Sequence, residues 1–283
     1  MKIAVASGKG GTGKTLVAAN LASVLSKDVS TTLVDCDVEE PNLHLFFPSP
    51  VTTADVTVPM PVFDPEACNH CGKCAEFCRY GAISVLPNRI LFFPELCHSC
   101  GGCMLVCPNG AIREEPVRIG IVTTSHPSNR LTLVTGILDE GQSHATPIIR
   151  AAKEMGGSSD LIVFDAAPGT TCSVVETVTD CDACILVTES TPFGLHDLSL
   201  AYEVMKLLNV PSGVVINRSD GEDAEVLAFC RSHGLSVLLT IPFDRGIAAV
   251  QNRGELISRK DRAWEEMFAE LYARCRTLVG VHE

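Results

Sequence analysis

The sequence lacks an excess of basic residues and lacks any long apolar run. Lysine and arginine together number 22 against 34 aspartates and glutamates, so the formal net charge is −12. This balance argues against a nucleic-acid surface or an anionic membrane as the usual partner. No stretch approaches the roughly 18 to 20 apolar residues that span a bilayer, and the N-terminal apolar run leads into a glycine-rich loop rather than a signal-peptide cleavage site. We therefore expect a cytoplasmic protein with no nucleic-acid partner and no stable membrane insertion.

The glycine-rich segment near the N-terminus carries a phosphate-binding signal. Residues 7–15 read SGKGGTGKT and follow a short apolar stretch, 2–6, that we predict to be a buried strand. This is the spacing of a P-loop between a strand and a helix. Glycines let successive backbone N–H groups approach an anion, Lys14 adds a positive charge for the outer phosphates, and Thr15 offers a hydroxyl to Mg²⁺. A glycine loop that merely turns the chain is the alternative. The residues expected to hold ATP or ADP here are Gly8, Gly10, Gly11, Thr12, Gly13, Lys14 and Thr15.

Eight of the fourteen cysteines fall in two equally spaced groups. Residues 68–83 read CNHCGKCAEFCRYGAI, and residues 97–112 read CHSCGGCMLVCPNGAI. Both carry the CxxCxxCxxxC spacing of bacterial ferredoxins with two 4Fe-4S clusters, in which the fourth cysteine of each run ligates the other cluster. Zinc usually takes two CxxC pairs with a longer gap between them, and disulfide scaffolds are short secreted chains. We predict two 4Fe-4S clusters, one on Cys68, Cys71, Cys74 and Cys107 and the other on Cys97, Cys100, Cys103 and Cys78.

The two cysteine runs differ at one position. Pro108 follows the last cysteine of the second run, whereas Arg79 follows the last cysteine of the first. Ligation needs no proline, but a positive charge at Arg79 would tend to raise the potential of the cluster that Cys78 helps to hold. His70 and His98 lie inside the ligand loops, where loop or supporting roles are favoured over ligation.

Two further apolar runs each deliver a carboxylate. Residues 31–35 lead into an acidic segment that contains Asp37, and residues 161–164 end at Asp165. Carboxylates at the carboxyl ends of buried strands lie on the edge where α/β sheets bind ligands. An ordinary acidic turn is the alternative for Asp37. Between these runs, prolines at positions 48, 50, 59, 61 and 65 predict a linker, with the exit from the first domain near Pro61.

The residue after the first glycine of the loop narrows the class. With Lys9 the loop reads KGGTGKT, which resembles the deviant Walker A P-loop of the MinD, ParA and Mrp type (SIMIBI) ATPases and of the nitrogenase iron protein. In that family this lysine reaches across a nucleotide-sandwich dimer to the phosphates of the other copy, comparable to an arginine finger. A solvated loop lysine is the alternative.

The resemblance extends to four further segments. The acidic segment 35–42 resembles switch I, with Asp37 near the attacking water, and DAAPGTTC at 165–172 resembles switch II, with Asp165 in the Walker B role. GVVINR at 213–218 resembles the motif for the nucleotide base, and IPFDRGI at 241–247 resembles the loop that flanks it. The resemblance thus implies Lys9, Lys14, Asp37 and Asp165 in catalysis, Gly169 beside the γ-phosphate, and Asn217, Arg218, Pro242 and Asp244 near the base.

Cysteines outside the two runs have open assignments. In the nitrogenase iron protein a cysteine just past switch II ligates a shared cluster, so Cys172 is a candidate, although a plain buried thiol is favoured. Cys181 and Cys184 form a CxxC, which we interpret as packing in preference to a metal site. MinD proteins end in a membrane-binding helix, but the predicted helix 262–278 carries three glutamates beside its aromatic stripe, which favours packing against the sheet.

Taken together, the resemblance implies an α/β fold with a doubly wound, mostly parallel sheet and an inserted small α+β ferredoxin-like domain. The expected ranges are 1–60 and 116–283 for the P-loop ATPase and 61–115 for the insert. The implied function is an ATP-hydrolysing dimeric switch that gates electron transfer, or delivery of iron-sulfur clusters or metal, to a client or redox protein. Its dimer, promoted by ATP, would form with a second copy or a related ATPase. The alternative is a MinD/ParA-like positioning or scaffold ATPase whose ferredoxin domain is a docking module.

Overall fold

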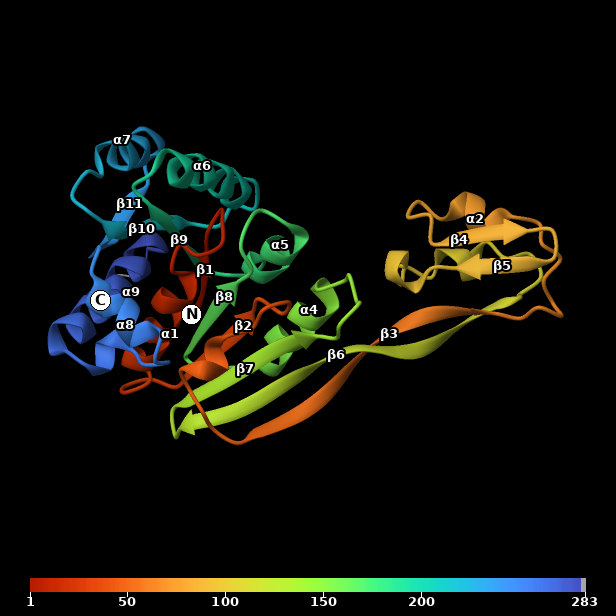
Figure 1. Cartoon of the computed structure of the whole chain (residues 1–283), viewed down its shortest axis with the longest axis horizontal. Coiled ribbons are helices and arrows are strands. Elements are labelled where there is room, and N and C mark those ends of the chain that lie inside the picture. Colours follow the sequence, from red (N-terminus) through yellow and green to blue (C-terminus); the bar gives the residue numbers. More distant parts are fainter. Residues whose placement is uncertain (281–283) are drawn as a thin grey trace.

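The computed structural model describes residues 1–280 and shows an α/β body from which a long arm projects (Figure 1). Within that range, nine strands form one sheet in the order β11-β10-β9-β1-β8-β2-β7-β6-β3, and β4 pairs with β5 in a separate hairpin. The strands are β1 Lys2–Ala6, β2 Thr31–Cys36, β3 Val51–Phe63, β4 Ile83–Leu86, β5 Arg89–Phe92, β6 Ile112–Ser128, β7 Leu131–Leu138, β8 Leu161–Ala166, β9 Ala183–Glu189, β10 Ser212–Ser219 and β11 Ser236–Pro242. The α-helices are α1 Lys14–Leu25, α2 Lys73–Phe77, α3 Gly102–Leu105, α4 Thr146–Met155, α5 Cys172–Val178, α6 Pro192–Leu207, α7 Ala224–His233, α8 Arg245–Gln251 and α9 Arg262–Leu278. Short 3₁₀ turns are η1 Leu43–Leu45, η2 Pro94–Leu96 and η3 Ile257–Arg259.

From β11 to β7 the neighbouring strands of the large sheet pair in parallel. Among the described residues of this sheet, the antiparallel pairs are β7 with β6 and β6 with β3, at one edge. Successive side chains of β1 point to opposite faces of the sheet, and both faces are apolar and covered by helices. Ile3 and Val5 point into a core with α1 and α9, whereas Ala4 and Ala6 point into a second core with α4, α5 and α6. Because successive strand residues face opposite sides, a strand buried on both faces reads as a continuous apolar run. The predicted mostly parallel α/β sheet is therefore confirmed.

The last helix, α9, has the predicted bounds and packs against the body. Phe268, Leu271 and Cys275 are fully buried, and Trp264 and Tyr272 cover the edge of the same core. Asp261 caps the helix by accepting a hydrogen bond from the Ala263 N–H at 3.0 Å. The expected packing of this helix is confirmed. No helix within residues 1–280 has the length and apolar character that crossing a membrane requires.

The predicted linker around the prolines is wrong, because β3 runs unbroken through Pro59 and Pro61. Opposite it, Pro116 lies in β6 as the register partner of Pro59. On the N-terminal side of Gly120, β6 no longer pairs with β7, so β3 and β6 form a two-stranded arm there with a free edge on each side. Proline is tolerated where the missing N–H faces an open edge. Because β3 pairs with β6 along its whole length, the proline-rich segment forms part of the arm.

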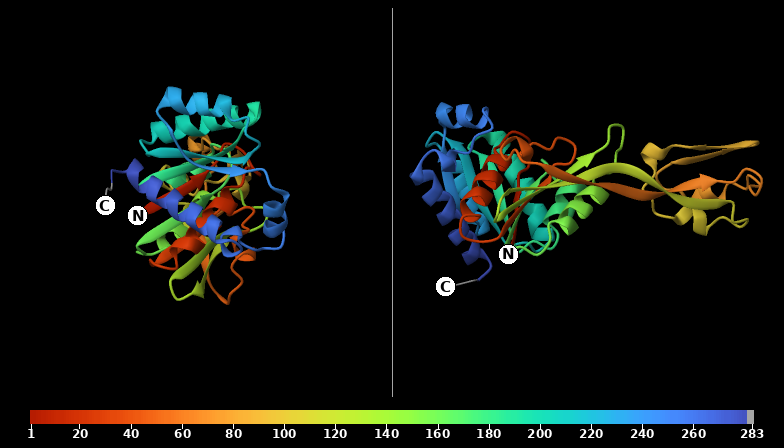
Figure 2. Two further views of the ribbon diagram at one scale, coloured as in Figure 1. Left: turned by 90° about the vertical axis from the view of Figure 1, so that its left-hand side faces the viewer. Right: turned by 90° about the horizontal axis from the view of Figure 1, so that it is seen from below.

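The arm carries a small unit, residues 64–111, which we call the insert (Figures 1 and 2). Its neck is closed by a hydrogen bond from the Asp64 N–H to the Ala111 carbonyl at 2.8 Å. The insert contains α2, α3 and the β4–β5 hairpin, and its own buried core consists of Cys74 and Ile83 together with Ile112 at the base of β6. The predicted boundaries at 60/61 and 115/116 fall within the arm, and the domain division itself stays a prediction. Residues 281–283 of the last predicted range lie outside the described residues.

Candidate functional site

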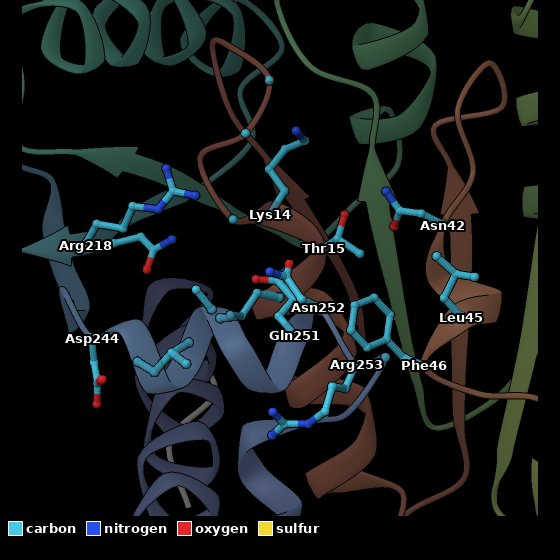
Figure 3. A pocket seen from close by; sticks show the side chains of 18 of the residues that line it. Lys14, Thr15, Asn42, Leu45, Phe46, Arg218, Asp244, Gln251, Asn252 and Arg253 are labelled. Carbon is cyan, nitrogen blue, oxygen red and sulfur yellow. The ribbon is translucent and has the colours of Figure 1, made fainter.

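The P-loop opens into a cavity of about 890 Å³ at the carboxyl ends of β1, β2 and β10 (Figure 3). This edge of a parallel sheet, where the helix N-termini point, is where α/β proteins hold ligands. Lys14 is the first residue of α1 and Thr15 the second, so both side chains stand at the positive end of the helix. The predicted residues that line the cavity are Gly10, Gly11, Gly13, Lys14, Thr15, Asp37, Asn217, Arg218, Pro242 and Asp244.

Asn217 holds the P-loop in shape. Its Nδ2 donates to the Thr12 carbonyl at 2.7 Å, although the two residues are 205 positions apart. Gly13 has a φ of 98°, and a side chain there would collide with the Asn217 amide, so this position requires glycine on both counts. The sequence predicted Asn217 as a reader of the base. The structure shows that one amide N–H serves the loop, which leaves Oδ1 and the second N–H for a ligand.

Asp165 is a buried carboxylate beside the P-loop. Its Oδ2 accepts a hydrogen bond from Thr15 Oγ1 at 2.6 Å, and its Oδ1 has no partner within residues 1–280. Burial raises the pKa of Asp165 to about 7, against the opposing effects of Thr15 and Lys14. Burial also lowers the pKa of Lys14, partly offset by Asp165 and Asp37. A carboxylate oxygen without a partner, beside the Thr15 hydroxyl, fits the oxygen-rich shell that Mg²⁺ requires. The predicted Mg²⁺ assignment thus has a matching donor set.

Asp35 is a residue that the sequence reasoning missed. It is almost fully buried, and its carboxylate accepts hydrogen bonds from the N–H groups of Asp37 at 3.2 Å and of Asn42 and Leu43 at 3.0 Å each. Burial, and next the Asp165 carboxylate, raise its pKa well above the ordinary value. Asp35 therefore folds the acidic segment 37–42 back over the end of β2 and places Asp37 in the cavity wall. Its signal in the sequence was its place at the end of a buried apolar run.

Lys9 lies outside the wall of the cavity. Its Nζ is 3.5 Å from Glu189 Oε2, and the other oxygen of that carboxylate pairs with Arg218 Nη1 at 2.6 Å. Glu189, at the end of β9, therefore holds two predicted ligand residues at once, and the sequence reasoning did not single it out. Four other predicted site residues also do not appear among the described residues that line the cavity: Gly8, Thr12, Asp165 and Gly169. Gly169 donates its N–H to the Ser7 carbonyl at 3.0 Å, so the predicted switch II touches the P-loop directly.

Several wall residues come from segments without a motif. The apolar part of the wall includes Leu45, Phe46 and Phe243, and polar groups come from α8 and the turn after it. Figure 3 shows Phe46, Gln251 and Asn252 around the same space as Lys14 and Thr15, although they come from separate parts of the chain. Asp244 caps α8 by accepting from the Gly246 N–H at 2.6 Å. The polar wall residues that were not predicted as site residues are Glu40, Asn42, Arg245, Gln251, Asn252 and Arg253.

The structure gathers each predicted cysteine quartet around its own cavity in the insert. Cys78, Cys97, Cys100 and Cys103 line a cavity of about 230 Å³, whereas Cys68, Cys71, Cys74 and Cys107 line a smaller one of about 20 Å³. Burial raises the thiol pKa of Cys74, with smaller contributions from Cys68 and Cys107. Burial likewise raises the pKa of Cys97, with contributions from Cys100 and Cys78. Cys74 and Cys97 thus each lie near other cysteines of the quartet to which they were predicted to belong.

The two quartets adopt the same backbone. His70 and Ser99, each two residues after the first cysteine of its run, have φ values of 56° and 50°, in a region that non-glycine residues rarely adopt. Gly72 and Gly101 repeat the left-handed conformation two residues later, before α2 and α3 respectively. Backbone N–H groups turn toward sulfur, from His70 to Cys68 Sγ at 3.4 Å and from Ala111 to Cys107 Sγ at 3.3 Å. Hydrogen bonds to cysteine sulfur are among the features that tune the potential of an iron-sulfur cluster where one is bound.

Cysteines outside the quartets lie in different surroundings. Cys172 is exposed at the start of α5, so the preference for a buried thiol is wrong there, because α5 begins at the surface directly after switch II. Cys184 is fully buried and Cys181 packs at the edge of the same core, where burial raises the pKa of Cys181 to about 12. This agrees with the packing interpretation. Across residues 1–280, no group of three or more histidine, cysteine, aspartate or glutamate side chains is arranged to hold a single metal ion.

Comparisons with known proteins agree with this arrangement. A family model described as the CobQ/CobB/MinD/ParA nucleotide binding domain matches residues 3–257. The uncharacterized protein MJ0579 of Methanocaldococcus jannaschii is 30% identical over 260 residues, which cover 90% of each chain. The uncharacterized protein MJ0578 of the same organism is 29% identical over 283 residues, covering 99% of this chain and 98% of the relative.

Solved structures show the same fold. The septum site-determining protein MinD from Pyrococcus horikoshii, complexed with Mg-ADP, superposes with a TM-score of 0.60 at 20% identity, covering 99% of this chain and 97% of that one. A putative plasmid partition protein from Borrelia burgdorferi, bound to AMPPNP, superposes with a TM-score of 0.56 at 16% identity, covering 96% and 98%. At these identities the likeness establishes the fold and no more.

Proposed function

The chain belongs to the CobQ/CobB/MinD/ParA family of nucleotide-binding proteins, and we propose that it is a dimeric ATPase whose nucleotide state controls what the insert contacts. The cavity at the P-loop is the observation that carries the ATPase part. It combines the Lys14 ammonium, the Thr15 hydroxyl and the Asp37 carboxylate at the N-terminal end of one helix.

Phosphoryl transfer to water requires positioning and charge neutralisation more than covalent chemistry. In the proposal, Lys14 and the P-loop N–H groups bind the phosphates of ATP, while Thr15 and Asp165 serve the Mg²⁺ shell. Asp37 orients the attacking water, and Lys9 of one copy acts on the nucleotide of the other. Lys9 must leave Glu189 to do so, which ties hydrolysis to dimer formation. Asn217, Arg218, Pro242 and Asp244 are proposed to surround the base.

For the insert, we propose two 4Fe-4S clusters held by the predicted quartets. The repeated backbone, the gathering of each quartet in one place and the N–H groups directed at sulfur support this assignment. One-electron transfer is the chemistry that such clusters supply when bound. The insert also presents the exposed apolar side chains Phe77 and Leu105 to solvent. Exposed apolar groups that gather on one small unit indicate a protein contact, here with a redox or client protein.

The decisive experiment compares cluster oxidation by an electron acceptor under anaerobic conditions with ATP, with ADP and without nucleotide. A rate that depends on nucleotide in the wild type, and no longer in a Lys14→Ala variant, supports gating. Equal oxidation rates in all three conditions contradict gating, and only the ATPase part of the proposal then stands. A pull-down with a Lys9→Ala or Asp37→Ala variant held with ATP would identify the partner.

A positioning or scaffold ATPase is the second candidate, and the comparisons support it more directly, since the similar solved structures include a septum site-determining protein and a partition protein. In that case the insert docks a partner and its clusters only support its fold. A partner that still binds after replacement of Cys74 and Cys103, with the insert folded, would favour docking over redox.

Delivery of iron-sulfur clusters or metal to a client is the remaining version of the first candidate. The exposed thiol of Cys172, near the switches, is its structural support. Labelled iron appearing in an apo-client, and less of it with Cys172→Ser, would separate delivery from electron transfer. A cytoplasmic location stays a prediction in all three cases.

A further inference from the structure

One end of the insert contacts the body at loop 139–145, which connects β7 to α4. Ser143 Oγ donates to the Glu95 carbonyl at 2.5 Å. The His98 ring stacks on Tyr80 with ring centres 3.6 Å apart and meets the His144 ring edge-on at 4.1 Å. Figure 1 shows the loop between β7 and α4 reaching from the body toward the insert. The contact is therefore tertiary, made by two segments of the chain that lie more than 40 residues apart.

The upstream end of this loop is attached to switch I. Leu138, the last residue of β7, donates its N–H to the Val38 carbonyl at 2.9 Å. Val38 directly follows Asp37, the residue proposed to orient the water. A displacement of Asp37 that follows the γ-phosphate therefore acts on the residue that precedes the loop.

The downstream end is attached to switch II through two helices. The loop runs directly into α4, where Arg150 makes two hydrogen bonds to Glu176 of α5, at 3.2 and 3.0 Å. Lys153 Nζ donates to the carbonyls of Thr177 at 3.1 Å and Thr179 at 2.8 Å, at the end of α5. Since α5 begins directly after switch II, these bonds tie α4 to the helix that follows that switch.

Space for such movement lies beside the contact. A cleft of about 950 Å³ is lined by Asp37 and Glu40 from switch I, by Thr171 from switch II, and by Tyr80 and His98 from the insert. The switches face the insert across this cleft instead of packing against it. Loop 139–145 therefore connects the two sides, and packed elements of this kind transmit a small shift as a change between discrete arrangements.

We propose that loop 139–145 is the joint through which both nucleotide switches set the position of the Cys97 end of the insert. The proposal deepens the proposed function and rests on it, because it requires switches that respond to the γ-phosphate. The joint consists of the Ser143 and His144 side chains on the body, and of the Tyr80 and His98 side chains and the Glu95 backbone carbonyl on the insert.

Hydrogen exchange of the anaerobic full-length protein tests the proposal, with Mg-ADP compared with Mg-AMPPNP. Peptides that cover 93–100 and 139–145 report the joint, and peptides of the P-loop report nucleotide binding. In the wild type, exchange of 93–100 is expected to differ at least about fivefold between the two nucleotides. In a Ser143→Ala, His144→Ala double variant, exchange there is expected to be about tenfold faster with either nucleotide, because a ring contact and a hydrogen bond are lost.

Two controls separate the possible outcomes. His126→Ala removes an exposed histidine at the far end of β6 and is expected to leave the wild-type pattern intact. Arg150→Ala is expected to keep the joint protected but to reduce its response to nucleotide. A double variant that keeps the full nucleotide response at 93–100 overturns the proposal. A wild type whose P-loop and switch peptides respond while 93–100 does not also overturns it, yet leaves the ATPase standing; absence of any P-loop response contradicts the ATPase itself.

Discussion

The body and the insert are stabilised in different ways. In the body, whole strands are buried, with Ile3, Leu33 and Phe164 at 0 to 1% exposure, and helices cover both faces of the sheet. In the insert, the buried cluster is limited to Cys74, Ile83 and Ile112, and much of what packs around it is cysteine. A unit this small rarely builds a sufficient core from apolar burial alone. The comparison indicates that the body folds by burying apolar surface, and we expect the insert to need a group bound by its thiols.

The largest effect is expected from breaking the insert at its thiols. A Cys74→Ser, Cys103→Ser double variant should lose iron, and the insert should become unprotected in hydrogen exchange, because metal binding and folding are coupled in small thiol-rich units. The thermal midpoint of the body should change little, since the arm separates the two cores. Cys172→Ser, which alters an exposed thiol outside the quartets, is the control. An insert that stays protected without iron would contradict the expectation that its fold depends on a group bound by its thiols.

The next effect is expected from the nucleotide cavity. Lys14→Ala should lower ATP hydrolysis at least about 100-fold, as loss of a group aimed at transition-state charge does, while iron content stays at the wild-type level. Lys9→Ala should also lower hydrolysis but keep Mg-ADP binding, since Lys9 lies outside the cavity wall. Lys27→Ala, which removes a surface ion pair with Glu265, provides the matched control. Loss of Mg-ADP affinity with Lys9→Ala would show that this lysine acts within its own copy.

A pH dependence should appear at the nucleotide site of the body. The pKa of Asp165 is raised from 3.8 to about 7, so the folded protein without nucleotide keeps a proton there that the unfolded chain has lost. The stabilising effect of that proton is fully present below about pH 4 and is lost as the pH rises through about 7. Because Mg²⁺ requires the carboxylate, the affinity for Mg-ADP should increase up to about tenfold per pH unit below 7 and level off above. Calorimetry in buffers of different ionisation enthalpy measures the released proton, and Asp165→Asn should abolish its release.

The smallest effect is expected from weakening the ion pair between Glu189 and Lys9. Glu189→Gln weakens its ion pair with Lys9 and should raise ATP-dependent dimerisation about two- to fivefold, the range for a partly exposed pair. Sedimentation velocity with Mg-AMPPNP measures it. Glu203→Gln, which alters a surface pair with Lys206 on α6, is the control. Weaker dimerisation with Glu189→Gln would mean that the carboxylate supports the dimer instead of restraining Lys9.

Short-range patterns in the sequence predicted the P-loop, the last helix and the two cysteine quartets. In each case the chemistry depends on residues a few positions apart, so spacing alone identifies it. The internal repeat likewise appears in the structure as matching left-handed residues at His70 and Ser99.

Only the tertiary structure decided the features that join distant segments. In the structure, the segment around Pro59 pairs with β6 to form an arm, and the Asn217 amide donates to the P-loop. Lys9 forms an ion pair with Glu189, and the His144 ring contacts the His98 ring. None of these has a local pattern, because each depends on which strands become neighbours and where the arm points. The sequence by itself thus identified the glycine-rich loop and the spacing of the two cysteine quartets. The long-range pairing of β3 with β6, and the packing of loop 139–145, decided how those two groups of residues are connected.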